Sequence, residues 1–260
     1  MPPLFASRLF HFCALLWALT SCAEAQVAPL GADVRQLLVS IAPDWDASAG
    51  KLLALERTAE GGWKPALGPI PVLFGKNGLA WGRGVLGTDE RGRHKVERDA
   101  RAPAGVFRLG TVYTYDSALP KGADYPFHTV TPADAWVDDS ALPQYNRFVT
   151  VDPKNPPPWF ESQKMRHNDD AYRWLVEIRH NADPPVPGMG SAIFFHIRRG
   201  ENRPTWGCTT MAKGDLVSLI RWLRPQAHPH YALLPWSEYQ KKWNAWGLPA
   251  PDLLGPIAPK

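Results

Sequence analysis

The sequence predicts a mainly β domain with few helices and one long loop region rich in proline and aromatic residues. Short apolar runs separated by Pro, Asp and Gly are typical of strands joined by turns. The pair Asn77-Gly78, flanked by apolar residues, is a strong hairpin signal. One segment, residues 215–223, has the i, i+3, i+4, i+7 apolar spacing of a clear helix, and Pro225 ends it.

The first half of the chain is expected to form a β-meander. A Gly-Gly turn follows the second apolar run, and a polar loop rich in Gly and Arg, residues 82–102, precedes the last one. The expected strands of this half are residues 36–42, 51–56, 72–74, 79–81 and 106–113.

A long irregular region, residues 114–163, separates the two halves. Loops of this length in a domain usually form lids or binding surfaces. Its many aromatic side chains argue against disorder, because a disordered segment is poor in them. We therefore expect a folded wall or lid beside the functional site.

The second half is expected to add strands at residues 172–180, 191–197 and 231–234 around the predicted helix. These segments complete one expected domain, residues 27–234. The tail, residues 235–260, contains a short amphipathic stretch and is expected to pack on the surface of that domain.

The first 25 residues have the pattern of an export signal. Arg8 precedes an apolar run that is too short for an ordinary transmembrane helix. Two processing routes remain open. Cleavage after the A-x-A site at residues 23–25 would leave Gln26 first, whereas a lipoprotein signal of residues 1–21 would leave a lipidated Cys22 that tethers the protein to a membrane. Both routes predict a protein that works outside the cytoplasm, in the periplasm.

Charge and composition narrow the classes of partner. The net charge of +4 suits an anionic polymer, but no run of Lys or Arg exceeds two residues, so nucleic acid is not an expected partner. No cluster of metal ligands is evident in the sequence, and we expect no metal site.

Cysteine usage singles out Cys208. Cys13 lies in the expected leader and Cys22 is removed or acylated, so Cys208 has no disulfide partner. An unpaired cysteine in an exported protein is a candidate reactive thiol, although a buried, inert cysteine is the alternative. His196, twelve residues earlier, is a candidate base or a structural histidine. Gly207 permits close backbone approach, and amides near Cys208 are a candidate oxyanion hole.

Several motifs carry a family resemblance. His196 followed by Thr205-Trp206-Gly207-Cys208-Thr209-Thr210-Met211 resembles the catalytic motif of the L,D-transpeptidases with the YkuD-type fold. The resemblance covers roughly residues 72–249, and a divergent proteobacterial subgroup is the most similar. The supporting motifs are Pro103-Ala104-Gly105-Val106-Phe107, Trp136-Val137-Asp138-Asp139 with Tyr145-Asn146-Arg147, and the approach to the histidine at residues 187–196.

The resemblance implies a YkuD-like β-sandwich or mixed sheet and a cysteine acyltransferase. Cys208 would attack the donor stem peptide of peptidoglycan, and the thioester would pass to the amine of an acceptor stem. His196 would act as base and then acid, with its ring oriented by the carbonyl of Ile197. The subgroup includes enzymes that form 1,3-type crosslinks between stems, and no cofactor is implied.

Two positions depart from the family pattern, because Ile197 replaces a common Gly and Thr210 replaces a common Arg. Arg203 or Arg199 would take over the role of that arginine, unless each is a solvated loop residue. Trp206 would line the peptide groove or pack in the core, and Tyr145 and Asn146 would bind the stem peptide or fix their own loop. The candidate substrate-binding residues are Trp206, Arg203, Tyr145, Asn146 and Thr209.

Other functions fit parts of this pattern. A cell-wall peptide hydrolase or D-amino-acid exchange enzyme would use the same Cys/His pair. A non-catalytic peptidoglycan-binding module would use only the aromatic loop. Papain-like enzymes place Cys before His, and sortases separate the two residues much further, so neither class matches this spacing.

Overall fold

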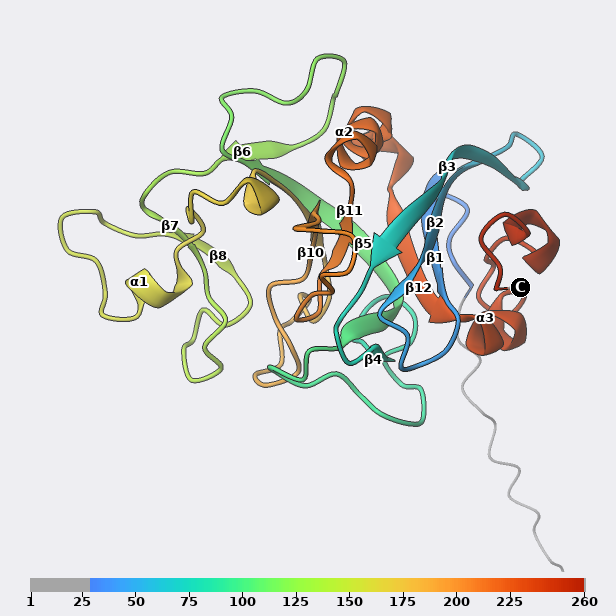
Figure 1. The fold of residues 1–260 in the computed structure, drawn as a ribbon, viewed down its shortest axis with the longest axis horizontal. Helices are drawn as coiled ribbons and strands as arrows, with labels where there is room; N and C mark the ends of the chain where they lie inside the picture. The colour runs from blue at the N-terminus through green and yellow to red at the C-terminus, as the bar shows by residue number, and fades with distance from the viewer. Residues whose placement is uncertain (1–28, 260) are drawn as a thin grey trace, which may run out of the picture.

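The structure, a computed structural model, describes residues 29–259. The chain in this range is mainly β with three α-helices, which confirms the predicted fold class. Eight strands form a mixed sheet that closes into a barrel (Figure 1), whereas a YkuD-like sandwich is not confirmed. The barrel strands are β1 (Gln36–Ala42), β2 (Ala49–Arg57), β3 (Trp63–Leu73), β5 (Ala102–Thr114), β9 (Trp174–Ile178), β10 (Phe194–Ile197), β11 (Thr209–Met211) and β12 (His230–Pro235).

The barrel closes because β12 pairs with both β1 and β5. Around the ring the order is β12, β1, β2, β3, β11, β10, β9 and β5. The pairs β1–β12 and β10–β11 are parallel, and the other pairs in the ring are antiparallel. The parallel pair β10–β11 is the one that carries the expected chemistry, since it places His196 opposite Thr210.

Short elements complete the fold. Strands β4 and β6 pair with β5 outside the ring, and β7 and β8 form a small separate sheet. No helix within residues 29–259 is long and apolar enough to cross a bilayer. These elements are β4 (Leu79–Trp81), β6 (Phe127–Thr129), β7 (Asp134–Trp136), β8 (Phe148–Thr150), α1 (Phe160–Gln163), α2 (Lys213–Trp222), α3 (Trp236–Lys242) and the 3₁₀ turns η1 (Asp170–Tyr172), η2 (Pro225–Ala227) and η3 (Pro251–Leu254).

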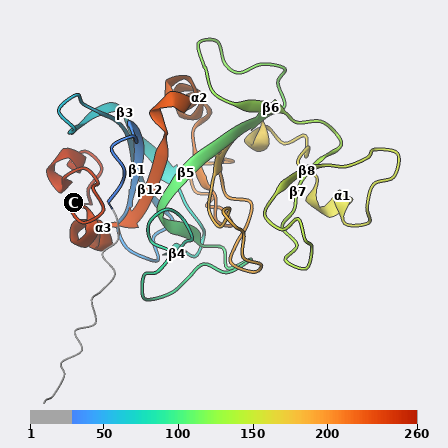
Figure 2. The same ribbon diagram turned by 180° about the vertical axis from the view of Figure 1, so that it is seen from behind.

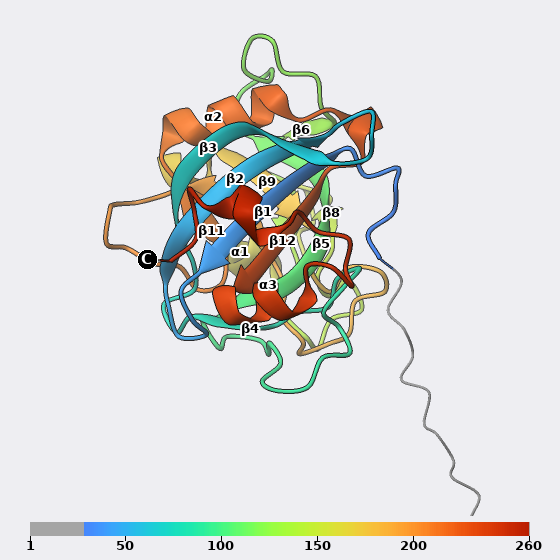
Figure 3. The ribbon, with the colours of Figure 1, turned by 90° about the vertical axis from the view of Figure 1, so that its right-hand side faces the viewer.

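The main hydrophobic core fills the barrel and extends under α2, α3 and the tail. Every residue of β1 is buried, because α3 covers its outer side while its inner side faces the barrel. Tail residues Trp246, Leu248, Leu254 and Ile257 belong to this same core. In Figure 3, α3 lies near the lower end of β12, and α2 lies above the strands.

A second, smaller core lies on the outer side of β5, β9 and β10. Its fully buried members are Tyr113, Val130, Met165, Leu175 and Phe194. Partly buried aromatic side chains of the region 114–172 pack against it, and so does Cys208. Figures 1 and 2 show β7, β8 and α1 on the side of the barrel opposite α3 and the C-terminus.

The helix and most strands lie where the sequence predicts them, but the hairpin prediction at Asn77-Gly78 is wrong. The turn itself forms, with the Gly78 amide donating to the Gly75 carbonyl at 2.9 Å. However, β3 pairs with β2 and β11, and β4 pairs in parallel with β5. A turn signal describes the local backbone and does not determine which partners the flanking strands choose. The expected leader, including Cys22, lies outside the described residues.

Candidate active site

Cys208 follows a tight turn, residues 205–208, that is attached to the barrel. The hydroxyl of Thr205 donates to the Cys208 carbonyl at 2.6 Å and accepts from the Gly207 amide at 3.0 Å. The Thr205 amide donates to the Phe74 carbonyl, and the Lys76 amide donates to the Thr205 carbonyl, each at 2.8 Å. The turn is therefore held both internally and by the chain that leaves β3.

Gly207 is required by the backbone of this turn. Its φ of +146° disfavours any residue with a side chain. A Cβ at this position would also lie 3.0 Å from the Arg101 carbonyl and 3.1 Å from the Ile193 side chain. The structure thus gives Gly207 a conformational role, and the bond to Thr205 occupies its amide, which removes that amide as an oxyanion donor.

The alternation of side chains along β10 and β11 places the candidate residues on one outer face. Phe195, Ile197 and Met211 belong to the barrel core, so their neighbours along each strand point outward. The outward-facing residues are Phe194, His196, Cys208 and Thr210. Since Phe195 is in register with Thr209, His196 of β10 lies diagonally across from Cys208, which immediately precedes β11.

The ring of His196 is oriented by a backbone carbonyl. Its Nδ1 lies 2.9 Å from the Ile197 carbonyl oxygen, which is the contact that the family resemblance implies. A carbonyl only accepts, so Nδ1 carries the hydrogen and Nε2 is left able to take a proton. The ring of Tyr172 packs against His196 at 5.1 Å between centroids.

Burial keeps both members of this pair neutral. It lowers the pKa of His196 to about 4, against the opposing effect of the Ile197 carbonyl. It raises the pKa of the Cys208 thiol to about 11, although the Phe194 amide and the charges of Lys95 and Arg199 act in the opposite direction. At neutral pH the resting state is thus a thiol beside an imidazole, which suits proton transfer during attack and not a preformed ion pair.

Two cavities meet at Cys208. The larger one, about 490 Å³, also contains His196, Trp206 and Arg203, and the smaller one, about 200 Å³, runs under Trp136 and Met165. Both are lined by Asp138, Tyr172, Ala192 and Cys208. The thiol donates to the Ala192 carbonyl at 3.5 Å, and Cys208 is a partly buried residue that lines both cavities.

Two predicted substrate-binding residues lie at this cleft. Trp206 is 68% exposed and lies under the ammonium of Lys76, 3.6 Å from the ring centroid, so the core alternative for Trp206 is wrong. Arg203 lines the same cavity with an exposed side chain. Arg199 also lines it, held by two bonds to Asp169.

Three other predicted substrate-binding residues do not face the cleft. The side chain of Thr209 points into the barrel, with its hydroxyl 3.1 Å from that of Tyr231, because it lies between two outward positions of β11. The Tyr145 hydroxyl donates to Glu97 and is buried. Both polar atoms of the Asn146 side-chain amide are already hydrogen-bonded within the protein. Its bonds run to the carbonyls of His180 and Asn181, the Trp136 indole and the Ala192 amide.

Thr210 stands where the similar family commonly has an arginine, but its side chain carries no charge. The residue is 1% exposed, and its hydroxyl has no protein partner within the described chain. It lines the larger cavity directly beside His196. The cations that line this cavity are Lys95, Arg98, Arg199 and Arg203.

The sequence analysis did not identify Lys95, Glu97 or Tyr172, although all three line the larger cavity. Lys95 and Glu97 belong to a charged stretch that has the pattern of a solvated loop. Their approach to Cys208 depends on how residues 82–101 fold back against residues 190–207, which no local pattern shows.

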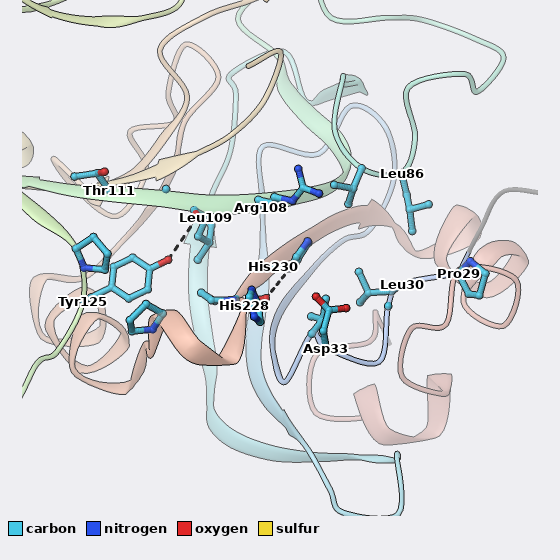
Figure 4. A pocket seen from close by; sticks show the side chains of 17 residues that line it. Pro29, Leu30, Asp33, Leu86, Arg108, Leu109, Thr111, Tyr125, His228 and His230 are labelled. Carbon is cyan, nitrogen blue, oxygen red and sulfur yellow. Dashed lines mark hydrogen bonds between the residues drawn. The ribbon is translucent and has the colours of Figure 1, made fainter. Parts of the chain in front are cut away.

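Two further cavities lie away from Cys208 and His196. The one in Figure 4, about 540 Å³, is lined by Asp33, Arg108, Tyr125 and His230 among others. There His230 is held by a 2.7 Å bond between its Nδ1 and the His228 carbonyl. The other, about 1060 Å³, adjoins it at Arg108. Neither brings a thiol together with a base, so cavity size alone does not locate the chemistry.

Within residues 29–259 no three His, Cys, Asp or Glu side chains are grouped to hold a metal ion. A comparison with protein-family models, with curated proteins and with solved structures finds no match for this chain. The assignment of the site therefore rests on its own geometry and on the sequence motif.

Proposed function

We propose that this protein is a periplasmic cysteine transpeptidase of the L,D-transpeptidase kind, with a YkuD-type catalytic arrangement, that crosslinks peptidoglycan stem peptides. One observation carries the proposal. The thiol of Cys208 lies at the junction of two cavities, on the same outer face as a neutral imidazole whose free nitrogen is Nε2. Two cavities that meet at one nucleophile suit an acyl donor and an acyl acceptor.

The proposed reaction has two stages. Cys208 attacks the carbonyl carbon between the third and fourth residues of the donor stem while His196 takes the thiol proton. The C–N bond then breaks, His196 protonates the leaving amine, and a D-amino acid departs from a thioester. In the second stage the acceptor amine attacks the thioester and gives a proton to His196, which returns it to sulfur as the C–S bond breaks.

The walls of the cleft support a peptide substrate. Trp206 offers an exposed aromatic surface beside the thiol, and Arg203 and Arg199 offer cations for the carboxylates of a stem peptide. On the other side, Trp136 and Met165 form an apolar wall of the smaller cavity.

The step above leads to a 3,3 crosslink. A 1,3-type crosslink, between L-Ala and diaminopimelate, stays within this proposal as the other regiochemical outcome. It requires attack on the carbonyl of the first stem residue, so that the leaving amine is that of the remaining stem and not of a D-amino acid.

Mass spectrometry of muropeptides incubated with the purified protein tests the proposal. We expect a crosslinked dimer. Release of a D-amino acid accompanies a 3,3 bond, release of the stem from its second residue onward accompanies a 1,3 bond, and fragmentation of the dimer distinguishes the two. Cys208→Ala should abolish the dimer while the circular dichroism spectrum stays unchanged. Dimers formed at the normal rate by Cys208→Ala would refute the role of Cys208. Trimmed stems without dimers would indicate the hydrolase instead.

A second measurement separates catalysis from simple binding. A carbapenem presents an activated carbonyl, so its mass should add to the wild-type protein and not to Cys208→Ala. His196→Ala should slow this acylation at least about a hundredfold, because general-base catalysis is commonly worth that much or more. A protein that binds peptidoglycan but is never acylated would be a binding module.

A further inference from the structure

Lys95 is a buried cation in the wall of the Cys208 cleft. Its side chain is 3% exposed and lines the larger cavity together with Cys208 and Gly207. The backbone holds it in place, with its amide donating to the Trp81 carbonyl at 2.8 Å. Lysine is almost never buried unless it is paired, so its position calls for an explanation.

The ammonium lies close to the turn that presents the thiol. A Cβ added at Gly207 would be 3.4 Å from Nζ of Lys95, so the charge lies against the residue that precedes Cys208. The charge of Lys95 also acts to lower the pKa of Cys208. No bond joins Lys95 to the sulfur in the resting state described above, where the thiol is neutral.

One carboxylate accounts for part of the bonding of Lys95. Nζ donates to Oδ1 of Asp99 at 2.7 Å. Asp99 also accepts from the amides of Val96 at 3.0 Å and Arg101 at 2.9 Å, so its carboxylate is held firmly by the backbone. An ammonium has three donors. Within the described residues Lys95 makes this single bond, which leaves two donors for a ligand or water in the cleft.

The proposed reaction needs a group that stabilises developing negative charge, and Lys95 is suited to this role. Attack by Cys208 places negative charge on sulfur and then on the carbonyl oxygen, and such charge needs fixed donors or cations. The Gly207 amide is occupied by Thr205, and Thr210 supplies no charge. We propose that Lys95, positioned by Asp99, stabilises the negative charge that develops at Cys208 and on the oxygen of the tetrahedral intermediate.

This inference rests on the proposed role of Cys208 as nucleophile and assigns its electrostatic partner. Other charged or titratable groups also face the cleft, and they come from four segments. Arg199 is neutralised by Asp169, and Glu97 accepts from the Tyr145 and Ser191 hydroxyls. The remaining groups are His196, Arg98, Arg203, Asp138 and Tyr172, with His180 behind Lys95. Of the cations near the turn, Lys95 is the buried one.

The test is the pH dependence of Cys208 alkylation by iodoacetamide, measured on the purified full chain by mass spectrometry. Lys95→Met keeps an unbranched side chain that is one atom shorter and removes the charge. We expect alkylation at pH 8 to slow about tenfold, with the rising limb of the profile displaced to higher pH. Lys95→Arg should stay close to wild type. Lys64→Met, which removes a surface lysine paired with Glu56, serves as the control and should have no effect.

Asp99→Asn gives the decisive contrast in sign. It removes the carboxylate that opposes the charge of Lys95, so alkylation of Cys208 should become faster than in the wild type. A purely structural role of Lys95 predicts instead that Lys95→Met and Asp99→Asn change the rate in the same direction. If Lys95→Met fails to fold, comparing Asp99→Asn with the double variant Lys95→Met/Asp99→Asn isolates the same charge without leaving a buried carboxylate unpaired. We expect the double variant to be about tenfold slower than Asp99→Asn.

Equal rates for these two variants, or an unchanged profile in Lys95→Met, would overturn the inference. The assay requires no wall substrate. A protein that forms no crosslinks but shows the expected sign reversal would therefore contradict the proposed function and leave standing the effect of Lys95 on the negative charge at Cys208.

Discussion

The two faces of β10 and β11 differ in what they contain and in what they do. The inner face carries Phe195, Ile197 and Met211, which pack in the closed core of the barrel. The outer face carries Phe194, His196, Cys208 and Thr210, and it is covered only in part, by the region 114–172.

The contrast shows how one short pair of strands contributes to the barrel core and to the proposed site at once. Because side chains alternate along a strand, a residue and its neighbour belong to different environments. Most of the unfolding free energy should depend on the inner positions, and reactivity should depend on the outer ones. Neighbouring substitutions can therefore test the division directly.

The largest effect on stability is expected from Phe195→Ala. Phe195 is fully buried against the ring of Tyr231, 4.6 Å between centroids, and its removal leaves a cavity in a closed core. We expect a loss of about 3–5 kcal/mol in the free energy of unfolding by urea. Phe194→Ala, one position away, should cost roughly half as much, because the covering region can relax into the space. Equal losses would show that the outer cluster is as rigid as the barrel.

Acid should destabilise the protein through its buried histidines. Burial, with a contribution from Lys95, lowers the pKa of His180 to about 3, and burial lowers that of His196 to about 4. The unfolded chain protonates near pH 6.5, so stability is constant above that value and decreases as the pH falls toward 4. Each histidine should cost about 2 kcal/mol by pH 5.

Urea unfolding at pH 7.5 and pH 5 measures this loss. His180→Gln keeps a donor for the Met189 carbonyl and an acceptor for the Arg83 amide but does not titrate. This variant should therefore lose less stability between the two pH values than the wild type. An identical loss in both proteins would exclude His180 as a source of the effect.

A smaller effect is expected from Asn146, which fastens the covering region to the barrel. Asn146→Gly removes four hydrogen bonds but tolerates the φ of +54° at this position. We expect a loss of about 1–2 kcal/mol and faster hydrogen exchange of residues 134–150. Asn155→Gly, an exposed position in the same region, is the matched control. Unchanged exchange in Asn146→Gly would mean that other contacts hold the region.

The smallest effect on stability is expected from Trp206, the most exposed large side chain of the cleft. Trp206→Ala should change the free energy of unfolding by less than about 0.5 kcal/mol. Its loss should nevertheless weaken binding of the stem peptide by about 1 kcal/mol, roughly fivefold in KM. Trp206→Phe should restore most of this binding. A normal KM in Trp206→Ala would place the peptide elsewhere.

The sequence predicts the mainly β class of the fold, but it does not predict that the sheet closes into a barrel. Segments such as β1 and β12 are recognisable because their continuous apolar runs are buried on both faces. Closure depends on β12 pairing with β1 and β5, and no local signal shows such distant partners. The strands β6, β7 and β8 have three residues each, too few for an alternation to be recognised.

The candidate site is predictable where a residue is unusual by itself. Cys208 stands out as a lone thiol, and His196 lies at the end of an apolar run with a recognisable motif after it. Tyr145 and Asn146 look equally suited to substrate, but the fold uses their polar groups internally. Lys95 looks solvated in the sequence, and only the tertiary structure buries it beside the thiol turn.

The closure of the barrel also constrains the order of its assembly. In the ring β1 lies between β2 and β12, and Leu37 pairs with His230. Among the strands of the described residues β1 is the first and β12 the last, so this pairing forms only when almost the whole barrel is available. Such distant contacts slow folding, because the intervening chain must be confined before the pairing repays the cost. A chain interrupted before β12 would leave β1 and β5 as two open edges, ready to pair with other molecules. The two open edges, and with them the risk of aggregation, are thus removed only when β12 pairs with β1 and β5.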